Sequence, residues 1–411
     1  MADNFNSLID HYFREEYGKV VSFLTSKYGT QHLELVEDSV QEALIKAVQT
    51  WPYAKAPSNP SGWIVKVASN KMIDHFRKAS RVDSAEVIPD KPADATEIDL
   101  ESIKDDVVKM MFACCHPTLS TEHQIILILK ILGGLSVKEI SRALLKKEET
   151  IAKSYTRAKA KFQKENIRLE LPSASEIKSR LNTVLKVIYL LFNEGYKSTL
   201  GDDLVKRELC DEAIRLNAIL LDNDDCNISM TNALMALMYF HSARFEARVD
   251  GDGKLVTLEF QNRGKWNTAS IDKGKVYLQE ATRGAFMNEF YIQATISGLH
   301  CEAKTYDETN WSEILELYDL MIRLNPSPII KLNRVVAESK VKSPAEALES
   351  LELLASNDQL TGHYLFHAIK GDLLIDTGKV KAGREATLKA MSLTNNSAEK
   401  EYLRSKIEEE P

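Results

Sequence analysis

A predicted helix between Asn59 and Arg81 carries, along one face, side chains that suit contacts with nucleic acid. A narrow arc holds an aromatic ring, an amide and charged groups, at Trp63, Lys66, Asn70, Asp74 and Arg77, with Lys71 and Lys78 beside it. Such a surface can bind phosphates, and it can stack on or hydrogen-bond bases displaced from a duplex. Packing of the ring of Trp63 against a neighbouring helix is the competing interpretation.

A second candidate surface lies between residues 130 and 164, where the pattern predicts a helix-turn-helix. Gly133 and Gly134 end one helix, and Ser136 and Glu139 form a capping box that starts another. After a turn, a basic helix buries Ile151, Tyr155, Ala158 and Phe162 and presents on another face Thr150, Lys153, Ser154, Arg157 and Lys161. The second helix of such a motif enters the major groove of DNA. A solvated, lysine-rich helix would show the same pattern.

A third group of polar side chains lies upstream, on a helix predicted to begin near Glu34. Asp38, Gln41 and Glu42 are spaced i, i+3 and i+4, so they form one compact acidic and amide face. The opposite face points inward with Val36, Val40, Ala43 and Ala47. An ordinary solvated face would have this spacing as well.

Two cysteine-containing triplets are the strongest candidates for catalytic chemistry, and neither is convincing. They are Cys114-Cys115-His116 and His300-Cys301-Glu302. Adjacent residues of a helix point about 100° apart, so these groups cannot readily meet on one substrate atom. The five cysteines are scattered without zinc-finger spacing, and Lys254 interrupts the calcium-loop pattern that begins at Asp250. We therefore expect buried, reduced thiols, no metal site, no cofactor and no enzyme activity.

The composition predicts an all-α protein of several domains. The 411 residues include 17 Gly and 11 Pro, and few stretches show the alternation typical of strands. A formal net charge of -7 means that any nucleic-acid surface must be local. No apolar run has the length of a membrane span, and the first residues lack the order of a signal peptide. We expect a cytoplasmic protein without membrane contacts.

Charge changes sign along the first half of the chain and indicates its division. Residues 60–81 are basic, residues 82–106 hold nine acids and two lysines, and residues 130–168 are basic again. Pro89 and Pro92 break any helix early in the acidic stretch, which is therefore predicted to be a linker.

A long series of amphipathic helices follows residue 171, beginning with Leu181, Val184, Leu185, Ile188, Leu191 and Phe192. A short hairpin or ordered loop is predicted within residues 248–260. Gly371, Gly383 and Ala390 lie where tetratricopeptide repeats place close-packing residues, although the large consensus aromatics are missing.

The order of these features resembles the extracytoplasmic-function (ECF) sigma factors of bacterial RNA polymerase, within the sigma-70 family. The resemblance covers about the first 170 residues and depends on Asp38-Ser-Val-Gln-Glu42, on Asn59 to Lys78, on the acidic linker and on the helix-turn-helix. The remainder resembles a branch with a helical, tetratricopeptide-like extension, through segments such as His116-Pro117, Leu191 to Tyr196 and Pro326 to Ala337. Lys146, in place of a frequent glycine, and Phe260 to Arg263, in place of an Asp-Gln-Asp-Arg run, depart from the pattern.

The resemblance implies four parts with separate roles. Residues 1–81 would be sigma region 2, 82–106 the linker, 107–170 sigma region 4, and 171–411 the extension. The RNA polymerase core would bind Asp38, Gln41 and Glu42. The minus-10 promoter element would contact the Trp63 to Lys78 face. The minus-35 element would contact Lys147, Glu149, Thr150, Lys153, Ser154, Arg157 and Lys161.

These assignments predict a sigma factor whose extension regulates transcription or engages a protein partner. The alternative is a one-component helix-turn-helix regulator with a ligand-sensing helical domain. Such a regulator would not need the Asp38 face followed by the Trp63 helix.

Overall fold

The computed structural model describes residues 16–54, 57–82, 100–144, 146–165, 167–173, 175–196, 207–251, 254–283, 287–356, 358–394 and 397–408. Every regular element among them is helical, and their one β contact is an isolated antiparallel bridge between Val249 and Leu255. The predicted all-α fold is confirmed. Contacts divide the chain into two compact units, residues 1–191 with 222–226 and residues 192–221 with 227–411.

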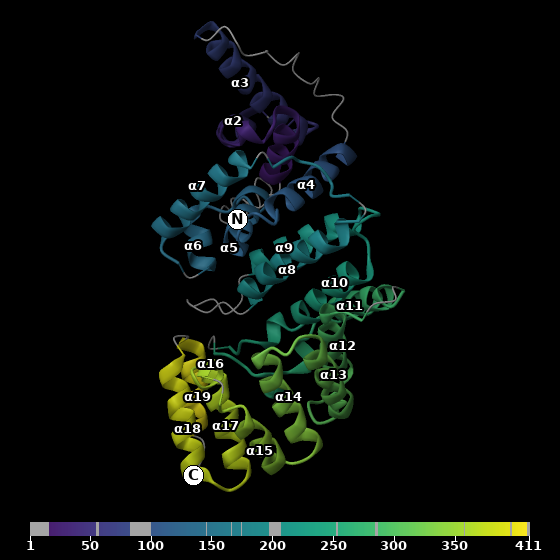
Figure 1. Cartoon of the computed structure of the whole chain (residues 1–411), viewed down its shortest axis with the longest axis vertical. Coiled ribbons are helices and arrows are strands. Elements are labelled where there is room, and N and C mark those ends of the chain that lie inside the picture. The colour runs from purple at the N-terminus through teal and green to yellow at the C-terminus, as the bar shows by residue number, and fades with distance from the viewer. Residues whose placement is uncertain are drawn as a thin grey trace. The chain divides into compact units, whose positions relative to one another are not determined.

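The N-terminal module consists of a helix over residues 16–28, a short 3-10 helix (Thr30–His32), α2 (Leu33–Ala54) and α3 (Pro60–Val82). The side-chain oxygen of Asn59 accepts a hydrogen bond from the backbone N–H of Gly62 at 2.9 Å, which caps α3. Helices α2 and α3 pack side by side (Figure 1). The residues of α2 that were predicted to point inward are buried, as is one side of α3: Val36, Val40, Ala43 and Ala47, and Val65, Met72, Ile73 and Phe76.

The helix-turn-helix module follows, built from α4 (Leu100–Cys114), α5 (Thr121–Leu127), a π-helical turn (Ile128–Leu132), α6 (Val137–Ala143) and α7 (Glu148–Lys164). Gly134 has φ +61°, a left-handed conformation that favours glycine and ends the π-helical turn. The capping box of Ser136 and Glu139 is present in both directions. The predicted stripe Ile151, Tyr155, Ala158 and Phe162 is buried.

The predicted linker falls largely outside the described residues, since 83–99 are not among them. Residues 100–106, at its end, form the start of α4. The boundary between the two compact units lies inside α8 (Ile177–Tyr196). The start of α8 packs on the first unit because Arg180 donates to the carbonyl of Phe112 at 2.7 Å and lies 5.8 Å from its ring centroid.

The second unit begins with the end of α8 and continues through α9 (Arg207–Leu221), α10 (Ser229–Ser242), α11 (Thr268–Ala281) and α12 (Glu289–Glu302). Between α10 and α11 the chain makes a tight antiparallel turn, where Val256 N donates to Arg248 O at 2.8 Å and Asp250 N to Lys254 O at 3.0 Å. This turn agrees with the predicted short hairpin or ordered loop. We call residues 254–260, which leave it, the strap.

Seven further helices complete the described part of the chain and pack in sequence as helical hairpins (Figure 1). They are α13 (Trp311–Leu324), α14 (Pro328–Val341), α15 (Pro344–Leu353), α16 (Asp358–Thr361), α17 (Tyr364–Asp376), α18 (Val380–Leu393) and α19 (Ser397–Glu408). Gly371 and Gly383 let α17 and α18 approach closely, because a Cβ on Gly383 would lie 2.9 Å from the carbonyl oxygen of Gly371. The predicted close-packing role of these glycines is confirmed.

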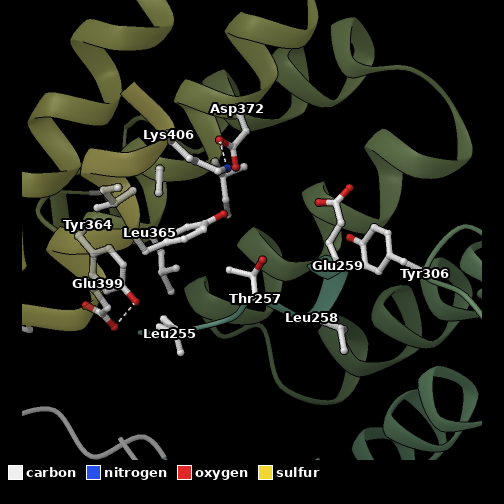
Figure 2. Close-up of a pocket in the computed structure, with 14 residues that line it drawn as sticks. Leu255, Thr257, Leu258, Glu259, Tyr306, Tyr364, Leu365, Asp372, Glu399 and Lys406 are labelled. Atoms are coloured by element: carbon white, nitrogen blue, oxygen red, sulfur yellow. Dashed lines mark hydrogen bonds and ion pairs between the residues drawn. The ribbon is translucent and has the colours of Figure 1, made fainter. Parts of the chain in front are cut away.

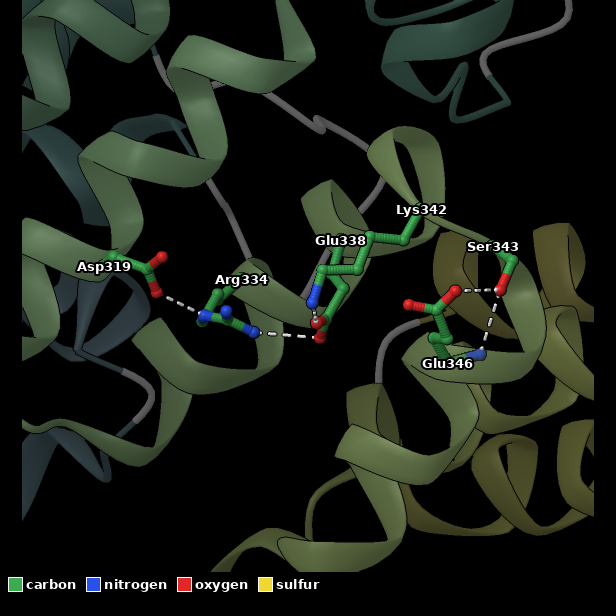
Figure 3. A network of polar contacts seen from close by, with 6 residues as sticks. All are labelled: Asp319, Arg334, Glu338, Lys342, Ser343 and Glu346. Carbon is green, nitrogen blue, oxygen red and sulfur yellow. Dashed lines mark hydrogen bonds and ion pairs between the residues drawn. The ribbon is translucent and has the colours of Figure 1, made fainter.

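Polar contacts connect α13 with α14, and a separate pair caps the start of α15 (Figure 3). Arg334 on α14 donates to Asp319 on α13 at 2.5 Å and to Glu338 at 2.9 Å. Lys342 donates to the second oxygen of Glu338 at 2.8 Å, and Ser343 caps the start of α15. Because the side chain of Glu338 is 3% exposed, its two cationic partners offset the loss of hydration. None of the described helices has the length and apolar character needed to cross a membrane.

Candidate polymerase and promoter interfaces

The predicted polymerase-binding residues form one exposed face of α2. Asp38, Gln41 and Glu42 are all exposed. Two apolar side chains continue the same stripe along the helix, Ile45 at 56% exposed and Val48 at 52%. We did not predict these two residues from the sequence. Their apolar character at helical spacing from Asp38 and Gln41 is the signal that could have identified them.

The predicted minus-10 residues lie on α3, and six of the seven are exposed: Lys66, Asn70, Lys71, Asp74, Arg77 and Lys78. Trp63 is half-buried, and its ring lies 5.5 Å from that of Trp51 in an edge-to-face arrangement. Part of the Trp63 ring therefore packs against α2, in line with the competing interpretation, and the rest of the side chain is exposed. Lys71 forms an ion pair with Glu42, so the two predicted surfaces on α2 and α3 are adjacent.

The predicted minus-35 residues lie at the start and along one side of α7. Lys147, Glu149, Thr150, Lys153 and Arg157 are exposed, whereas Ser154 and Lys161 are half-buried. Lys153 pairs with Glu149 at 2.6 Å, one helical turn away. Lys161 donates a hydrogen bond to the carbonyl of Thr118. Its ammonium is thus engaged within the module, while the N-terminal half of the helix presents its polar side chains to solvent.

The two modules of the first unit contact each other around one buried carboxylate, that of Glu37, which is 5% exposed. Its Oε1 accepts hydrogen bonds from the hydroxyls of Tyr17 at 3.1 Å and Tyr155 at 2.5 Å. Its Oε2 lies 3.2 Å from the ammonium of Lys159. Burial, together with the nearby Glu37 carboxylate, raises the pKa of Tyr17 and Tyr155, so both hydroxyls remain protonated donors.

Backbone packing supports this contact, which we call the module interface. A Cβ on Gly18 would come 2.4 Å from the carbonyl oxygen of Leu132, so the helix over residues 16–28 lies directly against the π-helical turn. Gln163 on α7 donates to the carbonyl of Gln31 at 3.2 Å. Glu37 is not among the predicted site residues, because an acidic residue between Val36 and Asp38 looks like part of a solvated helix face.

The cysteine triplets lack the features of a nucleophilic site. Burial raises the pKa of Cys114 and Cys115 well above the usual thiol value, and it raises that of Cys301 to about 11. None of the five cysteines, all of which lie among the described residues, forms a disulfide, and four of them are buried. A thiol must ionise to act as a nucleophile, so these environments work against such a role.

Three family models match the chain in the order in which its modules occur. Sigma-70 region 2 matches residues 12–82, and Sigma-70, region 4 matches residues 109–162. The chain belongs to the sigma-70 family. A family of unknown function, DUF6596, matches residues 180–282 of this sigma factor, across the start of its extension.

Two proteins are similar in sequence to this sigma factor. It is 36% identical over 385 residues to Uncharacterized protein R00370 of Rhizobium meliloti (strain 1021), across 92% of this chain and 90% of the relative. It is 22% identical over 142 residues to RNA polymerase sigma factor YlaC of Bacillus subtilis (strain 168), across 33% of this chain and 79% of that relative. The first alignment is long enough to include both sigma modules and much of the extension.

The prediction of an ECF-like sigma factor with a helical extension is confirmed. Regions 2 and 4 indicate a transcription initiation factor that acts with the RNA polymerase core on promoter DNA. The alternative, a one-component regulator, is the less well supported of the two. The family assignments also point to a non-enzymatic role.

Proposed function

We propose that the exposed face of α2 docks this sigma factor on the RNA polymerase core. The observation that carries this proposal is the stripe in which Asp38, Gln41 and Glu42 continue into Ile45 and Val48, both more than half exposed. Acidic groups beside apolar side chains suit a partner groove that is basic and partly apolar, because charge gives orientation and apolar burial gives affinity.

The exposed residues of α3 would bind the minus-10 element, and those of α7 would bind the minus-35 element. The division at residues 1–81, 82–106, 107–170 and 171–411 remains our proposed assignment of roles. The protein would then act where polymerase and promoters meet, in the bacterial cytoplasm. We also propose that the extension regulates the sigma modules or engages a protein partner, since stacked helical hairpins offer extended concave surfaces.

The module interface bears on how promoter binding begins. Promoter elements centred at minus-10 and minus-35 lie about 85 Å apart along B-DNA, at 3.4 Å per base pair. Two modules that share the carboxylate of Glu37 cannot occupy both elements together. Promoter recognition by both modules therefore requires the module interface to open, and binding of the core is a natural step at which that would occur.

Runoff transcription with purified core polymerase and the full chain tests these assignments. Asp38→Lys should abolish association with the core. Asn70→Ala should leave core association intact and weaken promoter opening, since Asn70 is exposed on α3. Failure of the unaltered chain to associate with core polymerase, or to direct initiation on any genomic fragment, would contradict the proposal.

A further inference from the structure

The second unit contains a cavity of about 290 Å³ that no part of the sigma function uses. Four segments line it: the strap, the loop that carries Tyr306, α17 and α19. Figure 2 shows Tyr364 and Glu399 on one side and Glu259 and Tyr306 on the other. Its volume is at the lower end of the range for small-molecule sites, which suits a ligand about as large as an amino acid.

Three tyrosine rings give the cavity an affinity for cations. They are Tyr306, Tyr364 and Tyr402. Burial raises the pKa of Tyr306 and Tyr364, so these rings stay neutral phenols with electron-rich faces. Lysines of the chain already use two of the rings in this way, because the ammonium of Lys340 lies 5.1 Å from the centroid of Tyr306 and that of Lys406 lies 5.2 Å from Tyr402.

The charges around the cavity also favour a cation. Three carboxylates line it against one ammonium, that of Lys406. Asp372 pairs with Lys406 at 2.6 Å, and Glu399 accepts a hydrogen bond from the hydroxyl of Tyr364 at 2.6 Å. An anionic ligand would therefore be repelled by the remaining negative charge.

Two polar residues of the strap line the cavity, Thr257 and Glu259. Glu259 is about half-exposed, and its ion pair with Lys340 is long, at 4.0 Å. Because such an exposed pair contributes little stability, the carboxylate can turn toward a bound cation at a small cost in free energy. The hydroxyl oxygen of Thr257 is buried and has no hydrogen-bond partner among the described residues. A buried polar atom without a partner is destabilising, and a bound donor would satisfy it.

An apolar lining completes the site, through Leu255, Leu258, Leu365, Ala368, Ile369 and Leu403. We propose that this cavity binds an organic cation with a short alkyl chain that ends in an ammonium or guanidinium group. The alkyl chain would pack on the leucines, and the cation would lie among the tyrosine rings near Glu259. The ligand could be a free amine compound or the side chain of a lysine or arginine on another protein, since the recognised chemistry is the same.

Calorimetric titration of the full chain tests the site with matched probes. Butylguanidinium is compared with butylurea, its neutral isostere, and an acetylated Ala-Arg-Ala amide is compared with the same peptide containing citrulline. We expect one saturable site per chain and at least about tenfold weaker binding of each neutral probe. Glu259→Gln should weaken cation binding about fivefold, whereas Glu316→Gln, an exposed carboxylate on α13, should leave it unchanged.

The pattern of binding identifies the source of the ligand. Binding of butylguanidinium without the arginine peptide supports a free compound, and binding of the arginine peptide at least as tightly as butylguanidinium supports a protein side chain. Equal binding of charged and neutral probes would overturn the proposal, as would equal affinity in the Glu259→Gln variant. Absence of heat from both charged probes at up to ~10 mM would overturn it as well. Because the readout is binding without polymerase, the result does not depend on the proposed function.

Discussion

Replacement of Glu37 by alanine should open the module interface. The change removes one carboxylate that accepts hydrogen bonds from two tyrosine hydroxyls. The same carboxylate is the nearest one to the ammonium of Lys159, and the side chain of Lys159 is 16% exposed. Loss of one partner from a buried ion pair typically costs about 3–5 kcal/mol. At the lower end of that range, the equilibrium between closed and open modules shifts by about 100-fold.

Distance measurements between spin labels would detect this opening. Labels at Gln49→Cys on α2 and Ala152→Cys on α7 lie at exposed positions, in a Cys301→Ser background that removes the one native cysteine that is not fully buried. The unaltered Glu37 chain should give one short, narrow distance distribution. The Glu37→Ala chain should give a broad distribution at longer distances.

Glu34 provides a matched control on the same helix. Its carboxylate lies 3.8 Å from the same ammonium, but its side chain is 75% exposed. Exposed pairs contribute about 0–1 kcal/mol, so Glu34→Ala should leave the distance distribution nearly unchanged. An unchanged narrow distribution in Glu37→Ala would refute the argument that this carboxylate holds the two modules together.

Four further outcomes follow from the structure. Ile45→Ala should weaken binding to core polymerase by about 1–2 kcal/mol in a competition assay, whereas Val276→Ala, 58% exposed on α11, should not. For promoter binding by the holoenzyme, the logarithm of affinity falls linearly with the logarithm of salt concentration, and Arg157→Ala should make this slope less steep by about one. An unchanged slope would exclude a contact between Arg157 and a phosphate. Burial and the guanidinium groups of Arg244 and Arg263 lower the pKa of His300 to about 3. As the pH falls, the unfolded chain therefore binds a proton at His300 before the folded chain does. Denaturant titrations should show that the free energy of unfolding decreases below pH 6.5, by about 2 kcal/mol at pH 5. The His300→Gln variant should lack this decrease. Gly383→Ala should destabilise the second unit by about 1–3 kcal/mol in thermal melts, because the new Cβ would lie 2.5 Å from Ile375, whereas Gly251→Ala meets no atom within 4 Å.

Local sequence determined most of the helices and their inward faces. The stripe Ile151, Tyr155, Ala158 and Phe162, the capping box at Ser136 and the cap at Asn59 each depend on residues within a few positions of one another. Helical periodicity and capping are local properties, so a single sequence reveals them. The order of the resulting modules was enough to indicate the sigma-70 family.

Tertiary structure alone decided the environments that join distant segments. Glu37 is buried because Tyr155, 118 residues later in the chain, packs over it, whereas helical periodicity alone places Glu37 at the edge of the inward face. The cavity likewise combines Glu259 and Tyr306 with residues of α17 and α19. Periodicity determines which side of a helix turns inward, whereas the segment that covers that side depends on the packing of the whole unit.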